Sequence, residues 1–473
     1  MQSGQIAHDF ASDKCRANCQ FAHDFAIDKL WEPGQIDNLP YNFGGPLNLV
    51  AETKSAAKTR DAALIFIFFT VVVDVLALGI IIPVLPKLVE GFLGGDTARA
   101  AEIYGLFGTV WALMQFFFSP VLGALSDRFG RRRVILLSCL GLGLDYILMA
   151  LAPTLWWLFA GRVISGITAA SYPTAGAYIA DVTPPEKRAA GFGMIGAAWG
   201  VGFVMGPALG GLLGAVNPRL PFWVAAGLTL VNALYGLFVL PESLAPERRK
   251  AFAWRRANPV GSLILLRSHP ELLGLSSINF IYFLAHQVLP SVFVLYASFR
   301  YGWDESAVGL TLAVIGVCTI IVQAGFVKRV VARFGERRAL FAGLLCGGAG
   351  YAIFGLAPAG IIFLGALPIF AFMGLFSPAA QGLMTRHVGP SEQGQLQGAN
   401  SSIMGITGMI GPGLFTLTFA SFIGAHRDWR APHLPGAPFM LAALLMAIAL
   451  VLAWRVTSRR PEIKRQEVEA YEQ

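Results

Sequence analysis

The sequence is dominated by long apolar segments that contain almost no charged residues. About 20 apolar residues in a helix cross the ~30 Å hydrocarbon core of a bilayer. Only 14% of the residues are charged, whereas soluble domains average about 25%. We therefore expect an all-α polytopic membrane protein. Its twelve predicted transmembrane helices are residues 62–86, 103–124, 134–152, 155–180, 191–214, 221–240, 272–298, 306–327, 339–357, 360–383, 398–424 and 438–454.

An internal repeat relates the first six segments to the last six. Shifting the sequence by 205 positions places Arg128-Phe129-Gly130 on Arg333-Phe334-Gly335, and Gly206-Pro207 on Gly411-Pro412. Agreement of a charged loop and a Gly-Pro pair at one offset indicates a repeat rather than chance. Such pseudo-repeated six-helix halves are typical of transporters that work by alternating access. The predicted halves are residues 62–240 and 271–456, joined by a basic cytoplasmic loop at 241–270.

The basic residues determine the expected orientation. The net charge is +8, and 29 of the 36 Lys and Arg residues fall on the membrane side that holds both termini. Cytoplasmic loops carry the excess of Lys and Arg, so the tails at 1–61 and 457–473 are both predicted to be cytoplasmic. The tail at 1–61 is polar and is expected to be disordered. Because the basic residues are spread over many loops, no concentrated basic face is left for a nucleic acid.

The loop after the second segment carries the pattern Gly-x-Leu-Ser-Asp-Arg-Phe-Gly-Arg-Arg-Arg at 123–133. The positive-inside rule explains its arginines but neither Asp127 nor its two glycines. The pattern resembles the signature loop of the major facilitator superfamily. This resemblance implies a cytoplasmic latch, formed by Asp127, Arg131 and Asp181, that breaks and remakes. The second copy has Ala332 in place of Asp127, so only the first latch is expected to be complete.

The fifth segment is rich in glycine and contains Gly200, Gly206, Pro207 and Gly210. One interpretation is close helix packing, because small residues let membrane helices approach each other. A Gly-Pro pair on such a face also resembles the antiporter motif of exporters in this superfamily. That resemblance favours export over uptake.

A closer resemblance, covering residues 62 to 456, is to the tetracycline efflux proteins of Gram-negative bacteria. The residues that carry it are Asp74 with segment 78–86, Leu144-Asp145-Tyr146, segment 161–168, Ala180-Asp181 and segment 393–398. It implies proton-coupled export of tetracycline-like or other amphiphilic drugs across the bacterial inner membrane. The expected partners are the amphiphilic substrate, protons and the lipid bilayer. The proton gradient would drive export, with no cofactor and no metal.

Three residues that are charged at pH 7 lie inside the predicted helices. Asp74 has twelve uncharged residues on each side, which places it near the middle of the membrane at about 1.5 Å per residue. A carboxylate there costs about 2.5 to 3.5 kcal/mol on insertion scales, so it normally faces a cavity or a partner. One interpretation is a structural ion pair between Arg162 and either Asp74 or Asp145. The resemblance instead assigns all three residues to the coupling and substrate pathway.

Buried polar residues also occur in the second half, where His286 and Gln287 lie in the middle of the seventh segment. Each such residue is more typical of a hydrogen bond between helices than of a ligand contact. Gln287 is the exception that we assign to the substrate, because the stretch from Gln287 to Tyr296 matches the efflux family's pattern.

Two positions depart from that family. Thr319 stands where those exporters have an intramembrane histidine, and Gly347 stands where they have an aspartate. Three explanations are open. Coupling runs through the N-terminal half alone, the proton stoichiometry differs, or the substrate is not tetracycline.

Other classes of function fit the sequence less well than export. The seven histidines include no His-Glu-x-x-His pattern, and the sequence around Ser165 is not Gly-x-Ser-x-Gly, so no enzyme motif is present. A receptor or scaffold would usually bring a large soluble domain. The main rival is a transporter of the same superfamily that carries a sugar or an organic acid.

Overall fold

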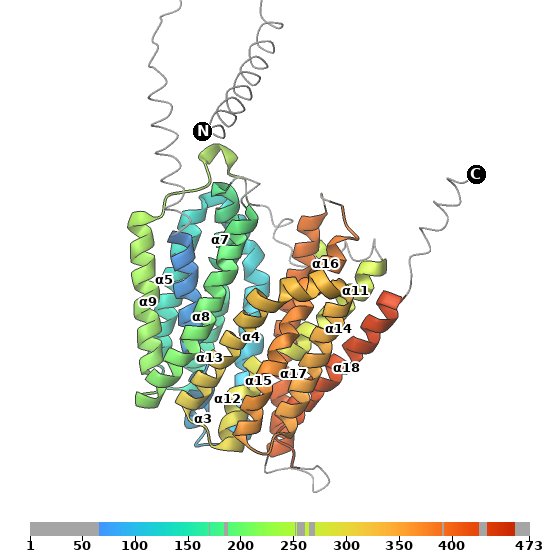
Figure 1. The fold of residues 1–473 in the computed structure, drawn as a ribbon. Coiled ribbons are helices and arrows are strands. Elements are labelled where there is room, and N and C mark those ends of the chain that lie inside the picture. Colours follow the sequence, from blue (N-terminus) through green and yellow to red (C-terminus); the bar gives the residue numbers. More distant parts are fainter. Residues whose placement is uncertain are drawn as a thin grey trace, which may run out of the picture. The chain divides into compact units, whose positions relative to one another are not determined.

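The computed structural model of the chain describes residues 66–169, 171–183, 188–250, 252, 261–263, 270–389, 392–424 and 433–458. Every element within these ranges is helical, and Figure 1 shows the long helices running side by side. The predicted tail at 1–61, nearly all of the tail at 457–473 and part of the loop at 241–270 lie outside the described residues.

Each half is a series of helices. The N-terminal half begins with the span Phe66–Phe92, whose last part is α3 (Leu85–Phe92), and continues with α4 (Thr97–Phe129), α5 (Arg131–Ala150), α6 (Leu155–Thr168), α7 (Ser171–Val182), α8 (Arg188–Val216) and α9 (Leu220–Val239). The C-terminal half contains α11 (Pro270–His286), α12 (Val288–Tyr301), α13 (Glu305–Ile321), the π-helical turn η4 (Val322–Phe326), α14 (Val327–Leu356), α15 (Gly360–Ala371), η5 (Phe372–Leu375), α16 (Phe376–Thr385), α17 (Gln393–Ile423) and α18 (Ala437–Ser458). Short 3-10 turns at Pro246–Arg248 and Gly261–Leu263 lie between the halves. We call the membrane side at which α3 ends, at the bottom of Figure 1, the outer side.

These helices account for the twelve predicted spans. Ten described helices are long and apolar enough to cross a membrane. One of them, Glu305–Leu356, is 52 residues long and contains two spans, because Gly335 at φ 79° interrupts the helix. The fourth predicted span corresponds to α6 and α7. The prediction of a twelve-helix membrane protein is therefore confirmed.

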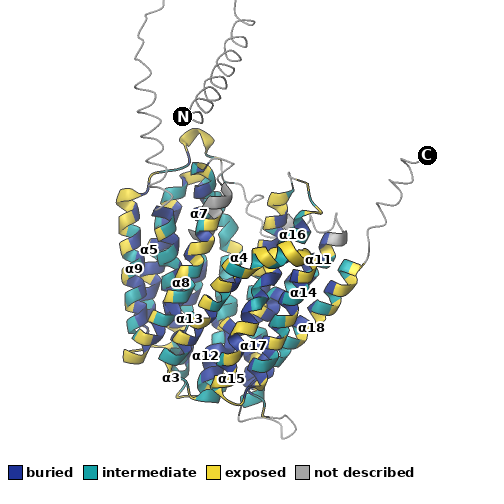
Figure 2. Ribbon diagram, in the orientation of Figure 1, coloured by how far each residue is buried: buried dark blue, intermediate teal, exposed yellow. Residues whose placement is uncertain are grey.

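Exposure of the side chains fits a surrounding bilayer. Leu137, Val216 and Phe238 are 65%, 79% and 79% exposed, and exposed positions follow the outward face of helices such as α9 in Figure 2. Large apolar side chains in such numbers would be unfavourable in water. Side chains that face lipid do not need to be buried by other parts of the protein.

The internal repeat is visible in the helix contacts. In the N-terminal half α8 packs on the first span, where a Cβ on Gly206 would lie 2.7 Å from Cα of Gly79. In the C-terminal half α17 packs on the equivalent seventh span through Gly411, which lies against Gln287. The two spans also break at equivalent positions, the first at residues 82–84 and the seventh at Gln287. The predicted pseudo-repeat therefore relates the packing as well as the sequence.

The two halves contact each other mainly through α4 with α17 and α8 with α13. Within these pairs the close approaches lie in the outer and central turns, as between Gly211 and Gly309 and between Gly108 and Pro412. Towards the inner ends, a Cβ built on Gly123 or Gly196 would meet no atom within 4 Å. The described helices of the halves therefore pack closely towards the outer side and loosely towards the inner side.

Candidate functional site

Arg131 joins two carboxylates at the inner end of the N-terminal half. Its Nη1 lies 2.6 Å from Oδ1 of Asp127, and its Nε donates to Oδ2 of Asp181 at 3.2 Å. The Arg131 side chain is 11% exposed, so salt screens these pairs less than pairs on the open surface. The three residues predicted to form the latch thus meet where α4 ends, α5 begins and α7 ends.

Glu242, which the sequence analysis missed, also belongs to this site. Its Oε1 accepts hydrogen bonds from the backbone N–H groups of Arg131 at 2.8 Å and Leu244 at 3.1 Å. The chain turns from α4 into α5 at Gly130, where φ is 102° and a Cβ would collide with the Glu242 carboxylate. A carboxylate at a helix N-terminus satisfies a free N–H and favours the helix dipole. The feature of the sequence that could have indicated this role is the position of Glu242, an acidic residue just after the sixth apolar segment.

The second half has an ion pair at the equivalent place with the charges exchanged. Shifting Arg131 and Asp181 by 205 positions gives Glu336 and Arg386. Nη2 of Arg386 lies 2.9 Å from Oε1 of Glu336, whose side chain is 16% exposed. The second copy lacks the Asp127 carboxylate, as expected from Ala332, but it contains this reversed pair, which the sequence analysis did not anticipate.

Asp145 and Arg162 form a loose pair in the outer half of the membrane. Both residues are buried, at 1% and 7% exposure, and Oδ2 of Asp145 lies 3.9 Å from Nη2 of Arg162. Neither carboxylate oxygen of Asp145 has a hydrogen-bond partner among the described residues. Arg162 points Nη2 at Sδ of Met149, 3.3 Å away. The pair is close enough for strong attraction but is not locked by a direct hydrogen bond.

Asp74 lies in a separate polar cluster. The thiol of Cys139 donates to Oδ1 of Asp74 at 3.8 Å, and the Asn232 amide donates to the Cys139 sulfur at 3.9 Å. The Asn232 carbonyl in turn accepts from the Thr70 hydroxyl at 3.3 Å. Cys139 and Asp145 are six residues apart on α5, which separates the two carboxylate sites by roughly 9 Å of helix rise.

Gln287 occupies the break between α11 and α12. Its side chain packs against α17, with Nε2 3.6 Å from the position of a Cβ on Gly408. Three other buried amides of the C-terminal half bond to one another: Asn279 donates to Asn400 at 3.0 Å, and Asn400 donates to Gln381 at 2.9 Å. These three residues thus form two hydrogen bonds between helices, and Gln287 takes part in neither of them.

The glycine face of α8 serves close packing on two sides. Gly210 lies against the backbone of Ile80 in the first span, and Gly206 lies against Gly79. Gly200 faces the opposite half, with Ile320 of α13 at 3.4 Å from a built Cβ, and the carbonyl of Pro207 approaches Gly309. The four residues of the predicted antiporter motif therefore lie where α8 joins the first span and the other half.

Thr319 and Gly347, the two residues of the C-terminal half that differ from the efflux family, carry no ionisable group. The Thr319 hydroxyl donates to the carbonyl of Ile315 at 2.8 Å, within its own helix. A Cβ on Gly347 would lie 2.7 Å from Cγ of Met373. An aspartate at position 347 would therefore have to displace that side chain.

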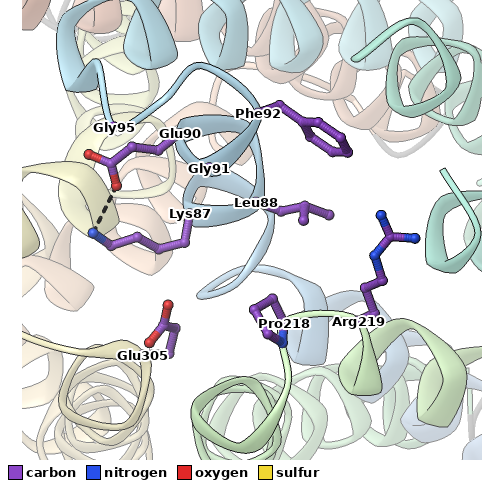
Figure 3. A pocket seen from close by; sticks show the side chains of 9 residues that line it. All are labelled: Lys87, Leu88, Glu90, Gly91, Phe92, Gly95, Pro218, Arg219 and Glu305. Atoms are coloured by element: carbon purple, nitrogen blue, oxygen red, sulfur yellow. Dashed lines mark hydrogen bonds and ion pairs between the residues drawn. The ribbon is translucent and has the colours of Figure 1, made fainter. Parts of the chain in front are cut away.

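A pocket of about 420 Å³ lies at the outer side between α3, the turn before α9 and the start of α13. Figure 3 shows Lys87 paired with Glu90, and Arg219 and Glu305 on other walls. The Lys87–Glu90 distance is 2.9 Å, and Lys87 also bonds to Ser298 of α12 in the other half. None of the residues assigned from the sequence lines this pocket.

Comparison with known proteins agrees with this architecture. The chain matches the Major Facilitator Superfamily over residues 67–412 and 275–472. It is 41% identical over 359 residues to the class C tetracycline resistance protein of Escherichia coli, across 76% of this chain and 90% of that protein. It is 38% identical over 400 residues to the class E protein of Escherichia coli, across 84% and 94%.

A solved structure supports the fold. The inward-facing, occupied structure of a bacterial homologue of the human lysosomal transporter Spinster has a TM-score of 0.67 at 16% identity, over 85% of this chain and 97% of that one. At this identity the likeness concerns the fold. Together with the sequence matches, it shows that the chain belongs to the major facilitator superfamily and, within it, to the family of the tetracycline resistance proteins.

Proposed function

We propose that this membrane transporter exports tetracycline-like or other amphiphilic drugs across the bacterial inner membrane in exchange for protons, with both termini in the cytoplasm. The observation that carries the proposal is Asp145, a buried carboxylate whose oxygens have no hydrogen-bond partner among the described residues. A group in that state gains or loses a proton without breaking a hydrogen bond. The tetracycline resistance proteins to which the chain is similar supply the substrate class.

Proton and drug would compete at the Asp145–Arg162 pair. When Asp145 takes up a proton it loses its charge, so its attraction to Arg162, 3.9 Å away, disappears. A substrate group that donates a hydrogen bond to the carboxylate would be held by the ionised form of Asp145 and not by the protonated form. Binding of the drug would therefore release the proton to water, and departure of the drug would let Asp145 take up a proton again. Asp74, hydrogen-bonded by Cys139, would provide a second proton site towards the inner side.

The conformational cycle would use the contacts at the two membrane faces. Lys87 and Ser298 connect the halves at the outer side, so opening outwards requires their hydrogen bond to break. The Arg131 network joins α4, α5 and α7 at the inner side, where it would set the rate of exchange between states. The glycine contacts of α8 with α13 would let the halves rock against each other with little steric resistance.

One observation favours a second candidate function. Thr319 and Gly347 leave two positions of the C-terminal half without an ionisable group, and a sugar or organic acid carrier of the same superfamily would not need a drug exporter's proton route there. A non-transporting receptor or scaffold is a more distant alternative.

Expression in a bacterium that lacks its own drug pumps tests the proposal. Resistance to tetracycline or to another amphiphile in a drug panel is expected, and a protonophore should abolish it. Everted vesicles should release protons when that drug is added, and the Asp145→Asn variant should not. If no amphiphile moves protons while a sugar or organic acid does, the metabolite carrier replaces the drug exporter.

A further inference from the structure

The C-terminal half places one histidine in the middle of a membrane span. His286 is the last residue of α11, and with Gln287 it lies at the centre of the span Leu272–Tyr301. The five other apolar segments predicted for this half, from 306–327 to 438–454, contain no Asp, Glu, His, Lys or Arg. His286 is therefore the one such residue that this half carries at mid-membrane in its apolar segments.

The His286 side chain is exposed, and its surroundings place it on the side that faces the other half. One turn further along, the carbonyl of Pro290 accepts a hydrogen bond from Tyr104 of α4 at 3.2 Å. One turn earlier, Tyr282 stacks on Phe376 with ring centroids 3.9 Å apart, and the Tyr282 and His286 rings are 6.2 Å apart. Beside it, Gln287 packs on α17. His286 thus lies in the part of the seventh span that approaches α4 and α17.

No charged side chain faces His286 from the helices packed around it. The described parts of α16 and α17 contain none, and those of α3, α12 and α13 carry charges only at their outer ends. The charges of α4 lie in its end turns, α18 carries one arginine at its inner end, and the one acid of α11 lies in its first turn. The titratable side chains placed beside this part of the span are the phenols of Tyr282, whose ring lies 6.2 Å from the His286 ring, and of Tyr104, which bonds to Pro290 one turn along. The charge on His286 would therefore depend on solvent protons and on the substrate.

We infer that His286 is a proton-binding residue of the C-terminal half, which takes up and releases a proton as substrate leaves and enters the space between the halves. Histidine is the side chain whose ordinary pKa, about 6.5, allows it to change charge between pH 5 and 8. The proton moves between imidazole nitrogen and water, and no bond to carbon forms or breaks. The inference rests on the proposed proton-coupled export and adds a residue that acts from the half opposite to Asp74 and Asp145.

The test uses the full-length protein reconstituted into vesicles, with tetracycline as the first probe and, if it is not carried, the amphiphile found in the drug panel. The variant His286→Gln keeps hydrogen-bonding capacity and removes titration, and His286→Asn checks that side-chain size is not the cause. His433→Gln is the matched control, because His433 is exposed outside the spans and stacks on Phe299. Three quantities are measured: drug counterflow without a proton gradient, accumulation driven by a gradient of one pH unit, and the pH dependence of drug binding.

Both His286 variants should keep counterflow, because substrate exchange needs no net proton movement. If one coupled proton is lost, the driven accumulation ratio should fall by about tenfold per pH unit, and the pH dependence of drug binding between pH 5.5 and 7.5 should flatten. His433→Gln should match the wild type in all three quantities. If the wild type accumulates drug and His286→Gln does so equally with the same pH profile, His286 does not carry a proton, and the proposed export stands. If the wild type moves no amphiphile at all, the proposed function fails and this inference fails with it.

Discussion

Arg162 should stabilise the folded chain mainly by neutralising Asp145. Both side chains are buried, and the charges are 3.9 Å apart. At an effective dielectric constant of about 20 this separation corresponds to roughly 4 kcal/mol of attraction. Removing one partner of a buried pair typically costs about 3 to 5 kcal/mol, because the other charge is left uncompensated. Arg162→Met should therefore lower the free energy of unfolding by about that amount.

The double variant is the informative comparison. Asp145→Asn removes the charge that Arg162→Met leaves behind, so Arg162→Met with Asp145→Asn should be more stable than Arg162→Met alone. Reversible unfolding in mixed detergent micelles would measure the free energy of unfolding of the wild type, of both single variants and of the double variant. These four values give the coupling energy between Asp145 and Arg162. The double variant should fold yet fail to couple protons to export, because stability is restored but the titratable group is gone.

Arg219→Met provides the control. Arg219 lies beside the outer end of α5, where it donates to the carbonyls of Ala150 and Ala152 at 3.0 and 2.9 Å. Adding Asp145→Asn to Arg219→Met should not restore the stability that Arg219→Met loses. If the effects of Arg162→Met and Asp145→Asn simply add, the two charges do not stabilise each other and the reasoning is wrong.

The remaining predictions concern coupling and conformational exchange. Asp74→Asn should abolish drug-driven proton flux in everted vesicles while the protein still inserts, since the amide keeps the volume and removes the titratable group; normal flux would exclude Asp74 from coupling. Asp127→Asn and Arg131→Ala should slow turnover without weakening drug binding measured in detergent. Either variant would contradict the latch if it lost drug binding and kept its exchange rate. Glu336→Gln should slow turnover less, because its partner Arg386 is 69% exposed and exposed pairs contribute only about 0 to 1 kcal/mol. Thr319→His should raise tetracycline-driven proton flux in the same vesicles, and an unchanged flux would show that this position lies off the proton route.

The fold could be predicted because its main signal is long-range and redundant. Twelve apolar segments of the right length leave few alternatives in a bilayer, where every backbone group must be bonded within its own helix. The meeting of Asp127, Arg131 and Asp181 was predictable for a different reason. Asp127 and Arg131 are four residues apart in one loop, and the family resemblance supplied Asp181. The contribution of Glu242 could not be predicted from the sequence, because it depends on how the chain after α9 returns to the start of α5.

The pairing inside the membrane required the structure. The sequence offered two acids for Arg162, and only the packing of α5 against α6 shows that the arginine lies beside Asp145. The surroundings of Asp74 depend on Cys139 and Asn232, which come from two other helices. Their residue types alone give no sign of a shared cluster.

The repeat offers a comparison of its own for the Asp145–Arg162 pair. Shifting these residues by 205 positions gives Gly350 and Leu367, and the C-terminal half fills this place with apolar contacts: a Cβ on Gly350 would lie 2.9 Å from Cβ of Phe370, and Leu367 is 2% exposed. The same helix packing is thus achieved without charges. Replacing a buried ion pair by well-packed apolar residues is often neutral or stabilising, so stability alone gives no reason for the N-terminal half to keep its pair. The proton exchange that we propose for Asp145 gives a reason of another kind, because only a charged pair changes its interactions when one partner gains a proton.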